Sequence, residues 1–445
     1  MRVASMLAYQ VRIALKSLRR TPVLSALLVA GIALGVAVAT TFVTTYATVA
    51  GNPVPTKSDR LFAVQLDAWS PQRPWDDDEP EEPPDQLTWR DATALLASDI
   101  PTYHTAMHKA GLMVHPGGEG QRPFRALTRM TRGDFFPMFD APFLYGGGWD
   151  RAADERPEAV AVLDEATNRR LFGGEDSVGR SVRIEDRDFT VVGVLAPWWP
   201  KPKYFDPLND PFERPEEVYL PLGWTPLMEI QSAGNSSGWK YLEGDAFADL
   251  LASEQLWLQY WVQLDSPEQR QAYAAFLDAY ALEQKKLGRF GRPLNNRLRD
   301  VMAWLAVREV VPDASRTMLV IGLLFLVVSA VNLIGILLGK FLARAPEVGV
   351  RRALGASRGA IFLQHLVECQ LVGVLGGALG LLLAVGVVGA VDRLFRGAEE
   401  AGLFALDLPM LAAGLLLALV AGLIAGVYPA WRICRVPPAN YLKQQ

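Results

Sequence analysis

The sequence is poor in cysteine and histidine, and neither sign of charge dominates it. Two cysteines in 445 residues exclude a framework of several disulfides and a zinc or iron–sulfur site built from several cysteines. The 44 basic and 48 acidic residues leave a net charge of -4, whereas phosphate binding needs a basic excess or a basic stripe. The composition therefore predicts no nucleic acid partner.

What the sequence has in abundance is long uncharged runs. Its residues are 50% hydrophobic, and the mean hydropathy of +0.13 is high for a wholly soluble protein. Four stretches contain no charged side chain: residues 23–46, 317–339, 369–391 and 409–431. About 20 apolar residues at ~1.5 Å rise each cross a bilayer core, so all four are predicted transmembrane helices. The first run is too long for a signal peptide, so we expect an uncleaved anchor.

The basic residues predict the orientation of these helices, since Lys and Arg accumulate in cytoplasmic loops. Residues 1–22 and 340–368 carry five basic side chains each, and residues 432–445 carry three, against two acidic ones in all three segments together. By contrast, residues 47–316 carry 29 basic and 42 acidic side chains, and residues 392–408 carry two and four. We therefore expect the first three segments in the cytoplasm and the last two outside.

The large outer segment, residues 47–316, mixes strand-like and helix-like patterns. The strand-like runs are residues 58–66, 159–163 and 181–195, and the helix-like ones are residues 88–97, 165–172 and 265–287. Residues 198–226 are rich in proline, which favours a loop. The expected fold class is an α-helical membrane protein with four transmembrane helices and a large α+β extracytoplasmic domain inserted between helix 1 and helix 2.

Three features of the outer segment have a functional and a structural interpretation. The acidic run 76–82 lacks the glycine and the ligand spacing of an EF-hand, so a solvated loop is favoured over a calcium site. His104, His108 and His115 could bind zinc, because His104 and His108 have the i, i+4 spacing of zinc ligands on a helix. The glutamate that follows the first histidine in a metallopeptidase helix is absent, so a metal site is not favoured. Trp257 and Trp261 also have helical spacing. They could line an aromatic binding groove, but tryptophans pack in a protein core more often.

Two patterns approach catalytic motifs and fail. Residues 335–341 (GILLGKF) have glycines one residue too close for a phosphate loop, and the run ends a membrane helix. Residues 355–359 (GASRG) match a nucleophile elbow, but no preceding strand is predicted, and Ser357 is expected to cap the next helix. The carboxyl group of Glu368 lies at the predicted membrane boundary, where water is expected to reach it. We predict no catalytic residue, no metal site and no cofactor.

The most informative segment is RAPEVGVRRALGA, residues 344–356. Pro346 interrupts the incoming helix, and the Glu347 carboxylate then lies in the first turn of a new helix, where it suits the helix dipole. The predicted short helix has a basic and an apolar surface, which fits docking in a groove of another protein or contact with anionic lipid headgroups. Its residues are Glu347, Val348, Gly349, Val350, Arg351, Arg352, Ala353, Leu354 and Gly355.

The run RAPEVGVRRALGASRGAIFLQHL resembles the cytoplasmic loop and second helix of the FtsX-like permease domain, expected here at residues 317–431. Residues 131–149 and 159–197 resemble the extracytoplasmic core of MacB-type ABC transporter permeases. Pro346 departs from the family, which usually has a polar residue at this position, so the short helix starts at a slightly different angle. Unlike fused MacB proteins, the sequence contains no nucleotide-binding domain.

The resemblance implies a non-catalytic permease subunit in the inner membrane of a bacterium. Its partners would be a second permease subunit, in a homodimer or heterodimer, and a separate ABC ATPase that binds ATP and contacts residues 347–354. Movement of the helices would be transmitted to the outer domain for export or efflux, and a periplasmic adaptor is a further candidate partner. The alternative is an extracytoplasmic sensor of peptides or envelope stress that translocates nothing.

Glycines spaced four residues apart in the predicted helices allow close helix packing. The glycines are Gly31, Gly35, Gly373, Gly376, Gly377, Gly380, Gly422 and Gly426. The sequence leaves open whether they pack within one subunit or across a dimer.

Overall fold

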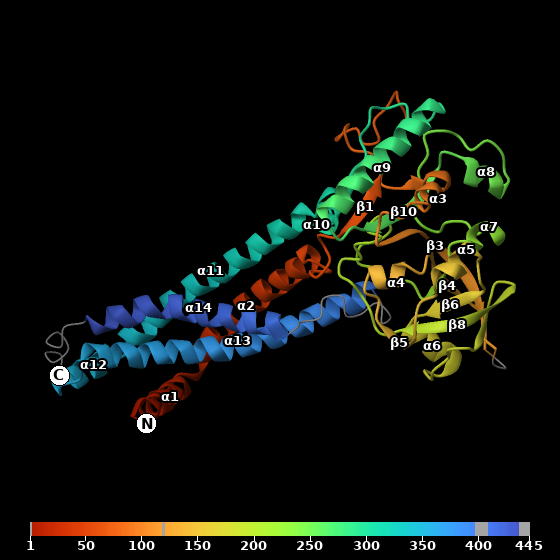
Figure 1. Ribbon diagram of the computed structural model, residues 1–445. Helices are drawn as coiled ribbons and strands as arrows, with labels where there is room; N and C mark the ends of the chain where they lie inside the picture. The colour runs from red at the N-terminus through yellow and green to blue at the C-terminus, as the bar shows by residue number, and fades with distance from the viewer. Residues whose placement is uncertain (1, 118–120, 397–407, 436–445) are drawn as a thin grey trace. The chain divides into compact units, whose positions relative to one another are not determined.

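The computed structural model describes residues 2–117, 121–396 and 408–435, and the chain divides into two compact units (Figure 1). The helical unit comprises Met1–Gly51 and Val311–Gln445, and the α/β unit comprises Asn52–Val310. The insertion of an α/β unit after the first membrane helix confirms the predicted fold class.

The helical unit is built from long helices and two short ones. Its helices are α1 (Arg2–Arg20), α2 (Pro22–Ala50), α11 (Asp313–Leu342), α12 (Ala345–Ala353), α13 (Arg358–Arg396) and α14 (Leu408–Cys434). Among the described residues, α2, α11, α13 and α14 are long and apolar enough to cross a membrane. These helices extend past the uncharged stretches, because a backbone helix continues through charged residues that lie beyond the bilayer core. Most of the predicted 392–408 turn lies outside the described residues.

Helix α1 lies in residues 1–22, for which the sequence predicted a cytoplasmic location but no helix. It ends at Arg19 and Arg20, whose positive charges suit a helix C-terminus. Pro22 then starts α2, since proline fits a first helical turn, where its missing N–H is not needed. The two helices are therefore separate, and α1 packs on α13.

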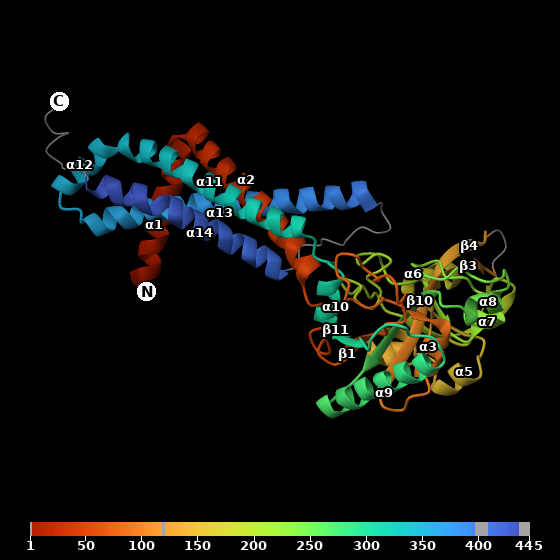
Figure 2. The same cartoon turned by 90° about the horizontal axis from the view of Figure 1, so that it is seen from above.

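Close helix contacts organise the membrane helices (Figure 2), in which α2 packs on α11 and α13, and α13 packs on α14. A Cβ added at Gly380 would lie 2.6 Å from the backbone oxygen of Ala33, and one at Gly376 would lie 2.7 Å from Cβ of Ile32. The other glycines of the four-residue spacings meet helices of the same chain in the same way: Gly31 and Gly35 meet α11, Gly373 and Gly377 meet α14, and Gly422 and Gly426 meet α13.

The α/β unit has eleven strands among its described residues. They are β1 (Leu61–Gln65), β2 (Leu87–Thr88), β3 (Tyr103–His115), β4 (Phe124–Thr131), β5 (Phe143–Gly146), β6 (Val160–Leu163), β7 (Ser181–Ile184), β8 (Arg187–Leu195), β9 (Val218–Pro221), β10 (Leu256–Gln263) and β11 (Arg297–Asp300). The helices are α3 (Trp89–Leu95), α4 (Phe135–Met138), α5 (Arg151–Glu155), α6 (Glu165–Phe172), α7 (Trp224–Leu227), α8 (Phe247–Ala252), α9 (Pro267–Lys286) and α10 (Val301–Val307).

Strand β3 joins two halves of this unit. Its first part pairs with β10, which continues the sheet through β1 to β11. Its second part belongs to a closed ring of strands in the order β3, β4, β9, β6, β8, β7 and back to β3. A closed ring has no free sheet edge except where a strand extends past its partner. Strand β3 is such a case, because β7 pairs only with its last residues, Val114 and His115.

Local signals in the sequence explain the helices of this unit. Thr88, Asp164 and Ser266 accept backbone N–H bonds at the starts of α3, α6 and α9, as N-cap residues do. Gly173 ends α6 with a φ of 74°, which glycine adopts without strain. All three predicted helices are therefore confirmed. Residues 198–226 are mainly loop, as predicted, with β9 and the start of α7 in their last part.

A buried cluster of charges fixes the proline-rich segment before β9. The guanidinium of Arg129 on β4 pairs with the carboxylate of Asp206 at 2.6 Å and with that of Glu216. The ammonium of Lys203 pairs with Glu216 at 3.4 Å and with Glu213 at 3.1 Å. Mutual neutralisation makes this burial possible, since an unpaired buried charge is costly. The segment is thus ordered by charge pairing as well as by apolar packing.

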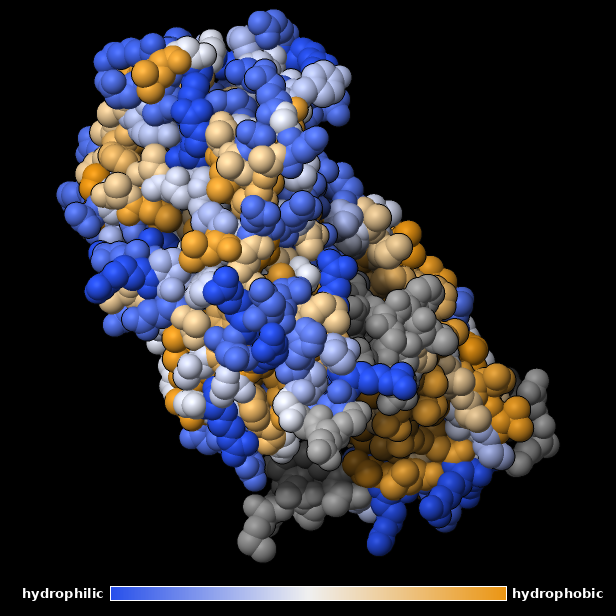
Figure 3. Space-filling view, turned by 90° about the vertical axis from the view of Figure 1, so that its right-hand side faces the viewer, coloured by the Kyte–Doolittle hydropathy of each residue, from blue (hydrophilic) through white to orange (hydrophobic). Residues whose placement is uncertain are grey.

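The surfaces of the two units differ (Figure 3). The α/β unit exposes mainly hydrophilic residues with scattered hydrophobic ones, whereas the visible helices of the helical unit are mostly hydrophobic. Helix α11 exposes Met318, Val320, Ile321, Leu324, Val327, Val328 and Val331. Such an extensive apolar surface fits lipid or another membrane helix.

We expect Gly380→Ala to destabilise the helical unit by about 2 kcal/mol, because the new methyl group meets the backbone of α2 and overpacking costs ~1–3 kcal/mol. The matched control is Gly386→Ala on the same helix, where an added Cβ meets nothing within 4 Å. Cys369 and Cys434 are free and buried in this unit, so a thiol-reactive dye reports its thermal unfolding in detergent. Equal melting temperatures for the two variants would contradict the packing argument.

Candidate functional site

The predicted short helix exists as α12, and it presents a mixed surface. Val348 and Gly349 are buried against the helical unit, whereas Glu347, Val350 and Arg351 are exposed. Leu354, which caps the end of the helix, is 83% exposed. Gly355 then turns the chain with a φ of 98°. This face combines exposed apolar and charged side chains, as protein interfaces do, and is therefore suited to contact another surface.

A buried carboxylate lies directly behind α12. Glu368 on α13 is only 1% exposed, although we expected water to reach it. The ammonium of Lys340 on α11 lies 2.7 Å from Glu368 Oε1, and the hydroxyl of Ser17 on α1 donates to the same oxygen at 2.5 Å. The expectation was wrong because three helices that are distant in sequence converge here and exclude solvent.

Arg344, in the link between α11 and α12, extends this network. Its guanidinium donates to the hydroxyl and to the backbone oxygen of Ser17 and lies 3.8 Å from Glu368. The imidazole of His365 lies 3.9 Å from Glu368 Oε2 and packs on the ring of Phe341, with 4.3 Å between the centroids. We call Ser17, Lys340, Arg344, His365 and Glu368 the Glu368 network. It joins α1, α11, the start of α12 and α13.

A pocket of about 250 Å³ opens beside this network. It is lined by side chains of α1, α12 and α13, including Lys16, Arg20, Glu347 and Arg351. Lys16 and Arg20 are exposed. The pocket therefore offers several cationic groups and one carboxylate, which suits salt bridges with the side chains of a docked partner.

The two arginines of α12 differ in their surroundings. The exposed Arg351 donates to the side-chain oxygen of Gln364 at 3.1 Å. The half-buried Arg352 donates to the backbone oxygen of Cys434 at 3.3 Å and so ties α12 to the end of α14. Arg351 can thus rearrange toward a partner, whereas Arg352 has a structural contact.

The rejected catalytic patterns have structural explanations. Residues 335–341 lie inside α11, so their backbone N–H groups are used in the helix and cannot cradle a phosphate. The hydroxyl of Ser357 accepts a bond from the backbone N–H of Ala360 at 3.2 Å. Ser357 therefore caps α13, as the sequence predicted.

The helical interpretation of the histidine and tryptophan pairs is wrong. His104 and His108 lie on strand β3, and Trp257 and Trp261 lie on strand β10. Both tryptophans are buried, which confirms core packing. Burial lowers the pKa of His104 to about 4 and that of His108 to about 3. The Nε2 atom of His108 bonds the hydroxyl of Thr225 at 2.9 Å.

The acidic run ends in ion pairs that hold the chain in place. Glu82 pairs with Arg299, and Asp85, just beyond the run, pairs with Arg308. Asp76 accepts the backbone N–H groups of Asp78 and Glu79. The loop thus has structural roles, and among the described residues no group of three or more His, Cys, Asp or Glu side chains is arranged to hold a metal ion.

Two family models match the sequence and together cover most of it. One, described as MacB-like periplasmic core domain, matches residues 25–280, and the other, described as FtsX-like permease C-terminal, matches residues 319–438. The first match includes α2 and most of the α/β unit, and the second includes most of α11 together with α12, α13 and α14.

Among curated relatives, the Macrolide export ATP-binding/permease protein MacB of Syntrophobacter fumaroxidans is 25% identical over 341 residues, and the match covers 71% of this chain and 47% of that protein. The Pyoverdine export ATP-binding/permease protein PvdT of Pseudomonas syringae is 26% identical over 312 residues, or 70% of this chain and 42% of that protein. The chain spans about half the length of the curated relatives it matches. The solved periplasmic region of MacB from Actinobacillus actinomycetemcomitans is 14% identical and covers 57% of this chain and 94% of its own, with a TM-score of 0.35.

Replacement of Glu368 by Gln should destabilise the helical unit by roughly 3 kcal/mol, because it leaves the ammonium of Lys340 buried without a counter-charge. The double variant Glu368→Gln/Lys340→Met removes both charges and should recover most of that loss. Thermal unfolding with the thiol-reactive dye measures both. A double variant no more stable than the single one would contradict the pairing.

His108 should lower the stability of the α/β unit as the pH falls below about 6.5, whereas Asp85 and Asp154, whose pKa burial raises to about 6, act in the opposite direction. A buried histidine with a lowered pKa stabilises the fold fully above its unfolded pKa of about 6.5, and this contribution is lost toward its folded pKa, at about 1.4 kcal/mol per pH unit. Because the folded-state pKa of His108 is about 3, the loss of stability continues from pH 6.5 down to about pH 3. His108→Gln should remove the His108 contribution, so that the variant loses less stability than the unchanged chain as the pH falls, measured by urea unfolding with tryptophan fluorescence. An unchanged slope would show that His108 does not titrate with unfolding.

Proposed function

We propose, from the premise that this chain belongs to the MacB-type family of ABC transporter permeases, that it couples ATP hydrolysis by a separate ATPase subunit to movement of its α/β unit for export or efflux. The observation that carries this proposal is the exposed face of α12 above the Glu368 network. The chain itself supplies no catalytic residue in this proposal, and the partner subunit binds the ATP.

The contacts of α12 suit the transmission of force. Its buried residues Val348 and Gly349 fix it to the helical unit, and Arg344 links its start to Ser17 and Glu368. A push on α12 would therefore move α1, α11 and α13 together and not only a loop. Helices α2 and α11 lead directly into the two ends of the α/β unit in the chain, so their displacement would reach that unit.

The surface of α12 supports docking to a protein. Val350 and Leu354 give it two exposed apolar side chains, and Glu347 and Arg351 give it charges of both signs. Contact with anionic lipid would use basic groups alone, whereas a protein groove can also use the apolar groups and the carboxylate. We therefore favour the ATPase over lipid headgroups as the partner of α12.

The arrangement in the membrane follows from the basic residues. We propose that both termini and α12 lie in the cytoplasm and that the α/β unit lies on the outer side of a bacterial inner membrane, because the basic segments flank the former and the acidic segment forms the latter. A multi-pass protein with this orientation places α12 where ATP is available.

Helix α11 is the candidate contact with a second permease subunit. It exposes an apolar face, and the amide of Asn332 is exposed on the same helix. A polar amide in a membrane helix gains most when a neighbouring helix supplies its hydrogen-bond partner. A dimer through α11, of identical or different subunits, would supply one. The names of the relatives, which describe export of macrolides and of pyoverdine, support export as the task, with a periplasmic adaptor as a further partner.

Reversal of the exposed charge of α12 tests the coupling. We expect Arg351→Glu and Leu354→Asp to abolish co-purification of an ABC ATPase, or to lower transport-coupled ATP hydrolysis about tenfold or more, while the permease stays folded. Arg352→Glu should act partly by loosening α12, because this side chain bonds Cys434. The matched control, Arg432→Glu, reverses an exposed charge on α14.

The measurement is the amount of ATPase bound and its turnover in lipid nanodiscs, with the melting temperature as a check on folding. Normal binding and turnover in the Arg351 and Leu354 variants would overturn the role of α12. Loss of both in the Arg432 control would show that charge at this end acts without regard to position.

A further inference from the structure

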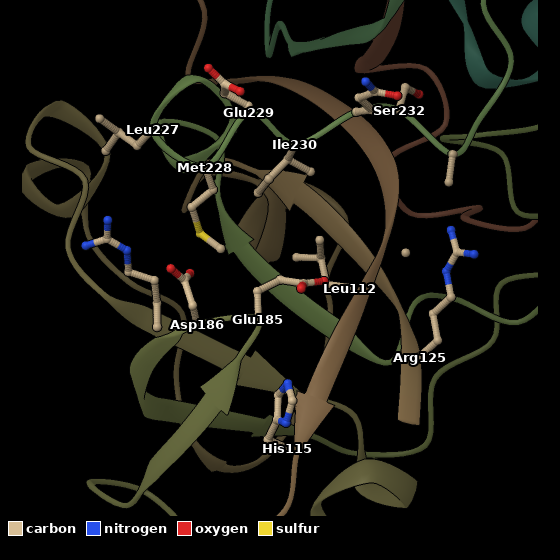
Figure 4. A pocket seen from close by; sticks show the side chains of 14 residues that line it. Leu112, His115, Arg125, Glu185, Asp186, Leu227, Met228, Glu229, Ile230 and Ser232 are labelled. Atoms are coloured by element: carbon tan, nitrogen blue, oxygen red, sulfur yellow. The ribbon is translucent and has the colours of Figure 1, made fainter. Parts of the chain in front are cut away.

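A second pocket, of about 760 Å³, lies in the α/β unit (Figure 4), and its volume is typical of small-molecule sites. It is bounded by the edge of β3, by the turn between β7 and β8, and by the segment 227–233. A role for this pocket goes beyond the proposed coupling through α12 and does not depend on it.

The pocket opens onto an unpaired piece of strand β3. The N–H and C=O of Leu127, which faces Gly111 across the β3–β4 ladder, both bond Glu217 and so point away from β3. In an antiparallel ladder such a pair is not hydrogen-bonded. The N–H and C=O of Gly111 must therefore point to the opposite edge of β3, which faces the pocket.

The residues on either side of Gly111 do have partners on that edge. The backbone oxygen of Lys109 accepts from the N–H of Ala233 at 2.8 Å, and that of Met113 accepts from the N–H of Glu185 at 2.7 Å. The N–H of Met113 donates to the carboxylate of Glu185 at 2.8 Å. For Gly111, no bond of this kind is formed among the described residues. The backbone N–H and C=O of Gly111 are thus without a partner among the described residues, whereas the backbone groups of Lys109 and Met113 on either side are bonded to Ala233 and Glu185.

A guanidinium lies beside this open backbone. The guanidinium of Arg125 lies over Gly111: a Cβ added at Gly111 would lie 2.3 Å from Nε and 2.6 Å from Nη2 of Arg125. Arg125 is exposed, and in the described part of the chain it makes no ion pair. Its forked donors match a carboxylate, which arginine binds in a bidentate manner.

The rest of the lining is mixed: Met228 is half-buried, Leu112 and Ile230 are buried in the core behind it, and the carboxylates of Glu185, Asp186 and Glu229 also line the pocket. Figure 4 shows Met228 and Ile230 projecting toward Leu112 in the middle of the pocket, with Arg125 on one side and Asp186 on the other. The backbone of Glu185 and that of Glu229 have φ values of 52° and 49°, which non-glycine residues rarely adopt. Strained residues at the rim of a concave site accompany function more often than chance.

We infer that this pocket binds the C-terminal end of a short peptide. The terminal carboxylate pairs with Arg125, an adjacent peptide group exchanges hydrogen bonds with Gly111, and one apolar side chain packs on Met228. The sealed flanks at Ala233 and Glu185 limit the ligand to a few residues, because a longer strand would collide with them. A membrane lipid or a sugar lacks this combination of carboxylate, amide and apolar group.

The test uses the full chain in lipid nanodiscs without any ATPase, and the probe is the tripeptide acetyl-Ala-Ala-Leu with a free C-terminal carboxylate. We expect calorimetry to detect binding of this peptide. The affinity of the C-terminal amide of the same peptide should be lower by about tenfold or more, because a charge-assisted pair is lost. Hydrogen exchange at Gly111 should slow when the acid form binds.

Two variants separate the site from general effects. Arg125→Gln should bind both peptides equally weakly, and Met228→Trp should abolish binding by filling the pocket. The matched controls Arg183→Gln and Leu282→Trp alter exposed side chains of the same kinds on β7 and α9 and should bind as the unchanged chain does. Failure of the acid peptide to bind at millimolar concentration, equal binding of the acid and the amide by the unchanged chain, or full binding by Arg125→Gln would overturn the inference.

Discussion

The helical unit depends on the neutralisation of one buried carboxylate. Glu368 lies where α1, α11 and α13 meet, and it is stable there only because Lys340, Ser17 and Arg344 supply positive charge and hydrogen bonds. In a medium of low polarity these contacts are strong, and breaking one leaves a charge that nothing compensates. The start of α12 is thereby fixed to three helices. A rigid base of this kind is what an exposed face needs in order to transmit a push without bending.

The membrane helices, and the caps of the helices in the α/β unit, could be predicted because each depends on a local signal. An uncharged run of bilayer length, or a Ser followed by Pro at residues 266 and 267, has a meaning that neighbours in space rarely change. The Glu368 network has no such signal. Ser17 and Glu368 are 351 residues apart, and neither residue indicates its partner. For the same reason the sequence placed Glu368 in contact with water, although burial came from helices that no local pattern brings together.

The errors in the α/β unit have a different physical origin. His104 and His108, like Trp257 and Trp261, are four residues apart, and this spacing puts side chains on one face of a helix and equally on one face of a strand. Spacing alone could not separate the two. The proline-rich segment before β9 is a loop as predicted, but its fixed position could not be predicted, because that position comes from Arg129 and Lys203 pairing with Asp206 and Glu216. Proline counts indicate a lack of regular structure, but they do not indicate a lack of fixed structure.

Gly111 connects the architecture of the α/β unit to a candidate task for it. An exposed strand edge is a hazard, because it can pair with another chain and aggregate. The ring of strands removes most such edges, and Ala233 and Glu185 seal the remaining edge of β3 on both sides of Gly111. Beside the gap lies the guanidinium of Arg125, which makes no ion pair among the described residues, and Met228 lines the same pocket. An opening limited to one residue admits a peptide end and excludes a strand, so the same geometry protects the protein from aggregation and gives the pocket selectivity.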